Sequence, residues 1–157
     1  MDKALELLSF RPRSESELEA RLRRERHAAD AIAAAISRCR ELGYLDDRAF
    51  ALSHVRDRLR LNPRGRRALR SELYRKGVDR GIAEEAIEEA FAEFGATERD
   101  LARRLAAKRA AALDRVELPA ARRRLSGYLA RRGFPATIVR DVVGETLAAA
   151  DPPTRPD

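Results

Sequence analysis

The chain has 157 residues, a formal net charge of +7, one cysteine and no tryptophan. Hydrophobic residues make up 44% of it but aromatic residues only 5%, so small and aliphatic side chains must build the core, which favours helices over sheets. No apolar run approaches the ~20 residues of a membrane span, and Met1 leads into an amphipathic segment that does not resemble a signal peptide. The single Cys39 rules out a disulfide framework and indicates a reducing compartment. We therefore expect a cytoplasmic protein of one domain or a few small units.

Helical spacing of apolar residues begins at the N-terminus, where a short helix is predicted at about 3–9. Ser14 and Glu17 form a capping box, in which a serine and a glutamate three residues later satisfy backbone N–H groups at a helix start. The buried positions of the second and third helices are predicted at Leu18, Leu22, Ile32 and Ile36.

Helix signals are equally clear in the middle of the chain. Asp46 and Asp47 favour a helix start, because acidic side chains stabilise the positive end of the helix dipole, and the helix is predicted over 47–61. Residues 62–65, Asn-Pro-Arg-Gly, predict a break. The next helix should stop at Gly77–Val78 in a Schellman motif, with the glycine in the left-handed conformation. The buried positions of the helices in this part of the chain are predicted at Phe50, Val55, Leu59, Leu69, Leu73, Ile82, Ala86 and Ile87.

The last third repeats these signals. Thr97 to Asp100 marks a helix start, the helix is predicted over 97–113, and Leu118–Pro119 is predicted as a break. Gly133–Phe134 is a second Schellman stop, and Pro135 suits the first turn of the following helix. The apolar positions are Leu101, Leu105, Leu125, Leu129, Ile138, Val142 and Val143. The segment 151–157 has too few apolar residues to fold and is predicted to be disordered.

These signals form an internal repeat. The positions Leu69, Leu73 and Gly77 correspond to Leu125, Leu129 and Gly133 after a shift of 56 residues. A backward shift of 51 residues gives Leu18 and Leu22, with His27–Ala28 expected in place of the glycine turn. Units of this length bury their faces by stacking on neighbours. We predict an all-α fold of three tandem three-helix repeats, at 1–45, 46–95 and 96–150.

No group of residues predicts catalysis or metal binding. His27 and His54 are each expected to be isolated surface or half-buried helix residues, and Cys39 to be a small core residue, since nothing is arranged to activate its thiol. There is no CxxC zinc motif and no phosphate-binding glycine loop. Asp46–Asp47 caps a helix, whereas Glu84, Glu85, Glu88 and Glu89 form an exposed acidic face at i, i+4 spacing that lacks the basic partners that would stabilise it. We therefore expect no enzyme activity, no metal and no cofactor.

Charge is segregated along the chain. Residues 56–76 carry nine basic side chains and two acidic ones, and residues 99–132 carry eleven and three, while 81–94 has five acidic residues and no basic one. Basic blocks of this kind suit contact with phosphates or with an acidic protein surface. Aromatic residues are sparse there (Tyr74, Tyr128 and Phe134), which argues against reading single-stranded bases. The predicted contact residues are Arg64, Arg66, Arg67, Arg70, Arg103, Arg104, Arg122, Arg123, Arg124, Arg131 and Arg132.

The spacing of several motifs resembles the RecX family of bacterial regulators over about residues 3–148. The residues that carry the resemblance are Ala4, Leu7, Leu8, Arg11, Arg13, Ser14, Glu17, Leu18 and Leu22, then Leu42-Gly43-Tyr44-Leu45-Asp46-Asp47 with Phe50 and Ala51, then Gly65, Leu69, Glu72, Leu73, Lys76, Gly77 and Val78. The third unit, around Leu125, Leu129 and Gly133, follows the family's weaker pattern.

The resemblance implies a cytoplasmic regulator without a cofactor that binds RecA–DNA filaments in their groove. Such a protein inhibits strand exchange, ATP hydrolysis and the coprotease function of RecA. An elongated, curved array of repeats, acting as a monomer, could span several RecA protomers through summed weak contacts. Single- or double-stranded DNA is a further expected partner of the basic faces, and a membrane is not.

Two other functions are consistent with a basic helical chain. The first is a helix-turn-helix DNA-binding protein, with Gly77–Val78 as its turn. In that case 82–94 would be the recognition helix, yet its glutamates would be repelled by DNA phosphates. The second is a non-catalytic scaffold associated with RNA or the ribosome. Salt-sensitive binding to bare nucleic acid without dependence on RecA would favour either alternative.

Overall fold

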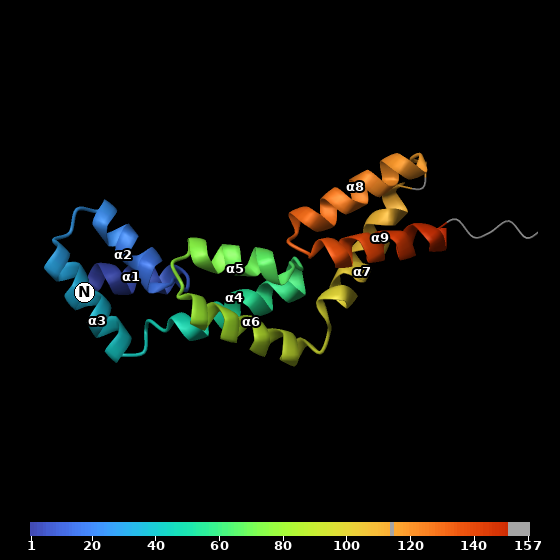
Figure 1. Cartoon of the computed structure of the whole chain (residues 1–157). Helices are drawn as coiled ribbons and strands as arrows, with labels where there is room; N and C mark the ends of the chain where they lie inside the picture. The colour runs from blue at the N-terminus through green and yellow to red at the C-terminus, as the bar shows by residue number, and fades with distance from the viewer. Residues whose placement is uncertain (114, 151–157) are drawn as a thin grey trace, which may run out of the picture. The chain divides into compact units, whose positions relative to one another are not determined.

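The computed structural model describes residues 1–113 and 115–150 (Figure 1). These residues form nine α-helices, one short 3-10 helix and no β-strand, so the predicted all-α class is confirmed for them. The elements are α1 (Asp2–Phe10), α2 (Glu15–Arg24), α3 (Ala29–Glu41), α4 (Asp47–Leu61), α5 (Arg66–Arg75), α6 (Arg80–Phe94), α7 (Glu98–Ala110), η1 (Ala111–Leu113), α8 (Leu118–Arg131) and α9 (Ala136–Ala150). The predicted disordered tail, 151–157, lies outside the described residues.

The chain divides into two compact units. Unit 1 comprises Met1–Asp57 and Arg70–Ala90, and unit 2 comprises Arg58–Leu69 and the chain from Phe91 onwards. In unit 1, α1, α2 and α3 pack on one another, and in unit 2, α7 packs on α8 and α9. The elongated, curved form and the repeat limits 1–45, 46–95 and 96–150 stay predictions.

The helix starts follow the capping signals of the sequence. Ser14 accepts a hydrogen bond from the N–H of Glu17, and the Glu17 carboxylate accepts one from the N–H of Ser14, which completes the predicted capping box of α2. Thr97 and Asp100 form a second capping box at the start of α7. Asp46 accepts hydrogen bonds at 2.9 and 3.0 Å from the first free N–H groups of α4. Each signal lies within four residues, so local sequence decides it.

The predicted glycine turns at two helix ends are confirmed, whereas the turn that ends α2 was predicted at the wrong residue. Gly77 and Gly133 have φ of 73° and 84°, and Val78 and Phe134 donate backbone hydrogen bonds to Leu73 and Leu129, as a Schellman motif requires. In the first repeat the turn residue is Arg26, with φ of 61°, and the expected replacement at His27–Ala28 was wrong by one position. The His27 N–H donates to the Leu22 carbonyl. The first repeat therefore forms the same turn, although a non-glycine residue in the left-handed conformation has a steric cost.

The equivalent apolar positions are buried in all three repeats. Leu18, Leu69 and Leu125 are each 0% exposed. The next equivalent set, Leu22, Leu73 and Leu129, is also buried, as are Ile36, Ile87 and Val143. Burial of one such side chain contributes roughly 1.5–3 kcal/mol, so these matched positions account for much of the stability of each repeat.

The helix breaks agree with prediction at one site and differ at another. Residues 62–65 separate α4 from α5, as expected. Leu118–Pro119 does not interrupt a helix but opens α8, with the proline in its first turn, where its missing N–H costs no hydrogen bond. The helix predicted over 97–113 ends at Ala110 and tightens into η1.

Two junctions join the start of one helix to the end of another. In the first helix-end junction (Ser14, Ser16, Lys76 and Gly77, in unit 1), the buried Ser14 hydroxyl donates to the carbonyl of Lys76 at the end of α5. In the second helix-end junction (Gly65, Ala68, Arg132 and Gly133, in unit 2), the N–H of Gly65 donates to the carbonyl of Arg132 at 2.8 Å. In both junctions the glycine that ends the helix faces the first turn of the other helix, and a Cβ on that glycine would overlap Ser16 or Ala68.

Candidate functional site

Three of the predicted contact arginines are engaged within unit 2. Arg132 donates to Asn62 Oδ1 at 2.6 Å and to the Pro63 carbonyl at 3.0 Å, and its guanidinium lies 4.8 Å from the Tyr128 ring centroid. The guanidinium of Arg66 lies 4.2 Å from the Phe91 ring centroid. Arg64 is half-buried and also interacts within the chain. These side chains support the fold around the break at 62–65.

Two further predicted residues are neutralised by carboxylates. Arg70 pairs with Glu84 at 2.5 Å, and Arg103 pairs with Glu145 at 3.0 Å. Glu145 also accepts a hydrogen bond from Arg99. The hydrogen bonds from Arg103 and Arg99 hold the pKa of Glu145 below its usual value, so this carboxylate stays ionised and neutralises part of the α7 surface.

The remaining predicted arginines are exposed, and none forms an ion pair or hydrogen bond with another residue that the structure describes. They are Arg67, Arg104, Arg122, Arg123, Arg124 and Arg131. Four of them lie on α8, where Arg131 leans toward Gly127. The exposed face of α8 therefore carries the densest unneutralised positive charge in the described part of unit 2. We call Arg122, Arg123, Arg124 and Arg131 the α8 arginine face.

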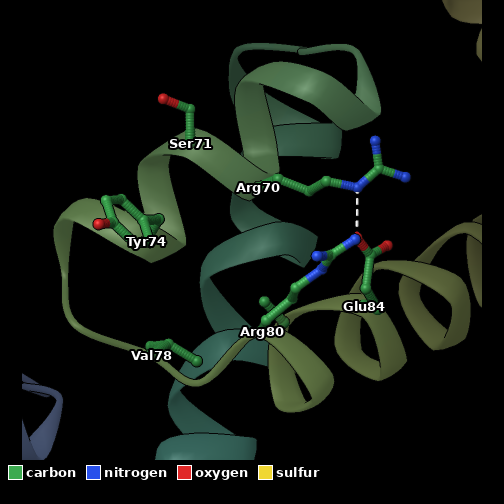
Figure 2. A pocket seen from close by; sticks show the side chains of 7 residues that line it. Arg70, Ser71, Tyr74, Val78, Arg80 and Glu84 are labelled. Carbon is green, nitrogen blue, oxygen red and sulfur yellow. Dashed lines mark hydrogen bonds and ion pairs between the residues drawn. The ribbon is translucent and has the colours of Figure 1, made fainter.

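Among the pockets on the described surface are two wide grooves. The first, which we call the tyrosine groove, lies between α5 and α6 and has a volume of about 620 Å³. Figure 2 shows Tyr74 and Ser71 on one side and Arg80 on the other, with the Arg70–Glu84 ion pair across it. Tyr74 is 81% exposed, whereas Val78 in the floor is buried. The groove has charges of both signs beside an exposed aromatic ring.

The second groove lies in unit 2 and has a volume of about 460 Å³. We call it the arginine groove; it is lined by Arg67, Arg122, Ser126, Gly127, Ala130, Phe134, Ala136, Val139, Arg140 and Val143. It brings together Arg67 from α5 and Arg122 from α8, which the sequence had only placed in two separate basic blocks. Sequence reasoning missed Arg140, because this residue lies outside both blocks and joins them only through the packing of α9.

The acidic helix α6 differs from the sequence-based expectation. Its glutamates were expected to lack basic partners, but Arg48 on α4 lies 3.7 Å from Glu85 and 3.5 Å from Glu89. Arg70 on α5 provides the partner of Glu84. The partners come from neighbouring helices, which the spacing along a single helix cannot reveal.

The described residues hold no group of three or more side chains that could bind a metal ion. Burial raises the pKa of the Cys39 thiol, and Cys39 is fully buried in the core of the first repeat as predicted, so it is a poor nucleophile. His54 is half-buried, with Nε2 2.9 Å from Glu72 Oε2. His27 is exposed in the turn after α2 rather than on a helix. Within the described ranges, no helix has the length and apolar character needed to cross a bilayer.

The few aromatic side chains near the basic blocks, Tyr74, Tyr128 and Phe134, are mostly unavailable for base stacking. Phe134 is only 4% exposed, and Tyr128 is half-buried beside the guanidinium groups of Arg109 and Arg132. Tyr74 alone of the three is exposed. This arrangement supports the sequence-based inference that stacking on single-stranded bases would be limited.

Comparison with known proteins extends over most of the chain. Sequence models of the first, second and third three-helix domains of RecX match residues 1–39, 46–87 and 97–143. A protein named regulatory protein RecX from Corynebacterium efficiens is 39% identical, over 92% of this chain and 70% of its own. Its counterpart from Mycolicibacterium vanbaalenii is 41% identical, over 92% and 80%, and that from Chlorobaculum tepidum is 33% identical, over 96% and 92%.

The same fold is present in solved structures. The crystal structure of RecX from Lactobacillus salivarius superposes with a TM-score of 0.77 at 25% identity, covering 92% of both chains. A second crystal structure of a regulatory protein RecX gives a TM-score of 0.74 at 23% identity, covering 90% of this chain and 69% of the other. The three-helix repeats predicted from the spacing are thereby confirmed.

The fold and the matches define a regulatory protein built from three-helix repeats. The chain belongs to the RecX family.

Proposed function

We propose that this protein binds RecA–DNA filaments and inhibits the strand exchange, ATP hydrolysis and coprotease activities of RecA. The observation that carries the proposal is membership of a family of regulatory proteins, with all three of its three-helix domains matched along the chain. The proposal includes a cytoplasmic location, a monomeric state and action without a cofactor.

The proposed contact surface is the α8 arginine face together with Arg67 and Arg104. These guanidinium groups are exposed, and none forms an ion pair with a described carboxylate, although the charge of Arg104 helps to lower the pKa of Asp100. They can therefore pair with acidic side chains or phosphates of a filament. Arg64, Arg66, Arg70, Arg103 and Arg132 remain in the proposed contact set, but each already interacts within the chain. We expect them to contribute less.

The alternative of a helix-turn-helix DNA-binding protein receives less support. The helix after the Gly77 turn is α6, and its glutamates are held by Arg48 and Arg70. A recognition helix of that composition would bring carboxylates toward the phosphates that line a DNA groove. Contact of DNA with the arginines of α7 and α8 stays compatible with the proposed function.

The direct experiment measures ATP hydrolysis by RecA on single-stranded DNA, titrated with this protein at two salt concentrations. We expect inhibition at protein concentrations well below that of RecA, because a filament regulator can block assembly at few positions. Absence of inhibition by a folded protein that still binds bare DNA would overturn the proposal. It would instead favour a nucleic-acid-binding scaffold.

The contact surface is tested by the combined variant Arg122→Glu, Arg123→Glu and Arg124→Glu. We expect at least about tenfold more protein to be needed for half-inhibition, since three cations become repulsive charges at a proposed interface. The matched control reverses three exposed arginines of unit 1 that form no ion pair with a described residue, Arg24, Arg75 and Arg80, with the same change in net charge. Circular dichroism should first show that both variants are helical. If both then inhibit RecA with equal potency, the contact face lies elsewhere.

A further inference from the structure

The arginine groove has an apolar floor, and the charged side chains that line it are all arginines. Its floor is formed by side chains of α8 and α9 and by Phe134 between them. Phe134, Val139 and Val143 are packed into the core of unit 2, so only a small part of each side chain faces the groove, and that part is held firmly in place. Three arginines, Arg67, Arg122 and Arg140, line the groove from three different helices.

No carboxylate lines this groove in the part of the chain that the structure describes. Arg67 and Arg122 have no ion-pair partner among the described residues, and Arg140 contacts Asp141 at 3.1 Å beside the groove. The first residue of α9, Ala136, also lines it, and the free N–H groups of a helix start add partial positive charge. The electrostatic character of the groove is thus uniformly positive, in contrast to the mixed charges of the tyrosine groove.

The wall formed by α8 consists of small side chains. Ser126, Gly127 and Ala130 line the groove, and Ala130 is exposed. A Cβ on Gly127 would approach only the flexible end of Arg131, at 3.0 Å. Packing inside the chain therefore does not require this glycine, although glycine within a helix costs about 0.5–1 kcal/mol relative to alanine. The low wall leaves room for side chains that come from outside the chain.

We propose that the arginine groove binds an acidic amphipathic segment of a protein partner, which inserts apolar side chains against the floor and places carboxylates beside Arg67, Arg122 and Arg140. Recognition of this kind follows the helix-in-groove mode, in which apolar anchors give affinity and flanking charges give orientation. A nucleic acid would meet the arginines equally well but leaves the apolar floor without a partner. Phe134 is too deeply buried, at 4% exposure, to stack on a base. The proposal does not depend on RecA being the partner.

The test uses a synthetic peptide of about 18 residues, or five helical turns, with leucines on one face and glutamates on the other. Binding to the full-length protein labelled with ¹⁵N is followed by nuclear magnetic resonance, with the backbone amides of Ser126 and Gly127 as reporters. Control peptides replace the glutamates with glutamines or the leucines with serines, and an oligothymidylate of matched charge tests nucleic acid. We expect the acidic amphipathic peptide alone to shift the groove amides strongly.

Two variants and one matched control make the result specific. Ala130→Trp should fill the groove, and the combined variant Arg67→Glu, Arg122→Glu and Arg140→Glu should reverse its charge; we expect each to weaken peptide binding at least about tenfold. The control, Arg123→Glu, Arg124→Glu and Arg131→Glu, changes the net charge equally on exposed sites outside the groove lining and should bind within about twofold of the original protein.

Three outcomes would overturn the proposal: no shift with the peptide, equal loss in the control variant, or groove shifts produced by the oligothymidylate and not by the peptide. The last of these would reassign the groove to phosphate binding. Because the readout is peptide binding, failure here leaves the RecA experiment unaffected, and failure there leaves the groove assignment unaffected.

Discussion

The two helix-end junctions solve the same packing problem with different chemical groups. In the first, a serine hydroxyl bonds to the carbonyl of Lys76, and Gly77 lies against the side chain of Ser16. In the second, a backbone N–H bonds to the carbonyl of Arg132, and Gly133 lies against the backbone of Ala68, whose N would be 2.5 Å from an added Cβ. The first junction therefore depends on side chains that substitution can change. The second depends on close approach of two backbones, and side-chain changes can only obstruct it.

The largest expected effect is that of Gly133→Ala. The change places an L-residue in the left-handed conformation at φ 84° and forces its Cβ onto the backbone of Ala68. We expect a loss of about 3 kcal/mol or more in the free energy of unfolding, measured by urea denaturation. Ala68→Gly should restore little, because the N and Cα of residue 68 remain in place. Substantial rescue would contradict the backbone nature of this junction.

Gly77→Ala tests the first junction in the same way. The steric conflict here involves the Ser16 side chain, whose Cα is 3.8 Å from the added Cβ. We expect a loss of about 2–3 kcal/mol, of which Ser16→Gly in the double variant restores the steric part and leaves about 1 kcal/mol for the left-handed conformation. A double-mutant cycle measures this coupling, with Ser16→Gly alone as the control. If the effects of Gly77→Ala and Ser16→Gly on the free energy of unfolding were additive, the Ser16 side chain would not be the group that a Cβ at residue 77 meets.

Ser14→Ala should cost about 2 kcal/mol. The substitution removes the N-cap acceptor of Glu17 N–H and the donor to the Lys76 carbonyl, at a site that is fully buried. Thermal unfolding provides the measurement, and Thr97→Ala is the control, because Thr97 caps α7 in a similar capping box at an exposed position. A cost no larger than that of Thr97→Ala would mean that the bond to Lys76 contributes nothing.

Arg26→Gly should instead stabilise the protein by about 1 kcal/mol. Arg26 is the one non-glycine residue with positive φ among the described residues, and no side-chain hydrogen bond or ion pair of Arg26 with a described residue is present to offset its steric cost. The midpoint of urea denaturation should rise without a change in slope. A fall in the midpoint would indicate that the arginine side chain contributes more than its backbone conformation costs.

The smallest effect concerns pH at the first junction. Burial opposes ionisation of Glu17, but hydrogen bonds from Arg11 and Lys76 outweigh it and leave the pKa of Glu17 below its usual value. Ionised Glu17 therefore stabilises the fold above the pKa of the unfolded carboxyl, and this contribution disappears as the pH falls through the folded pKa. Glu17→Gln should cost under about 1 kcal/mol at neutral pH and converge with the original protein in acid. A difference independent of pH would assign the effect to packing.

Most local signals in the sequence allowed accurate prediction, although Leu118–Pro119 opens α8 and was wrongly predicted as a break. The capping boxes at Ser14 and Thr97 and the glycine turns at Gly77 and Gly133 each involve residues within a helical turn or two. The turn at Arg26 was misplaced because no glycine marks it. The bonds of Arg132 to Asn62 and Pro63 span about seventy residues, and neither periodicity nor composition carries that information.

The same distinction applies to the candidate site. Exposure of Arg122 to Arg124 could be predicted, since three consecutive arginines on one helix cannot all find carboxylates nearby. Arg66 and Arg132 looked equivalent to them in the sequence, yet an aromatic ring engages each of these two guanidinium groups, and Arg132 also donates to the Pro63 carbonyl. Arg140 enters the arginine groove only through the tertiary packing of α9.

The first helix-end junction has a consequence for synthesis of the protein on the ribosome. Its hydrogen bond joins Ser14 to a carbonyl 62 residues later, and a buried hydroxyl gains its acceptor only when that residue is available. Helices α1 to α3 emerge first and can form their own core, but their edge at Ser14 stays open until α5 has left the exit tunnel. The nascent chain therefore matures in overlapping steps, because the first repeat is completed only by a residue of the second.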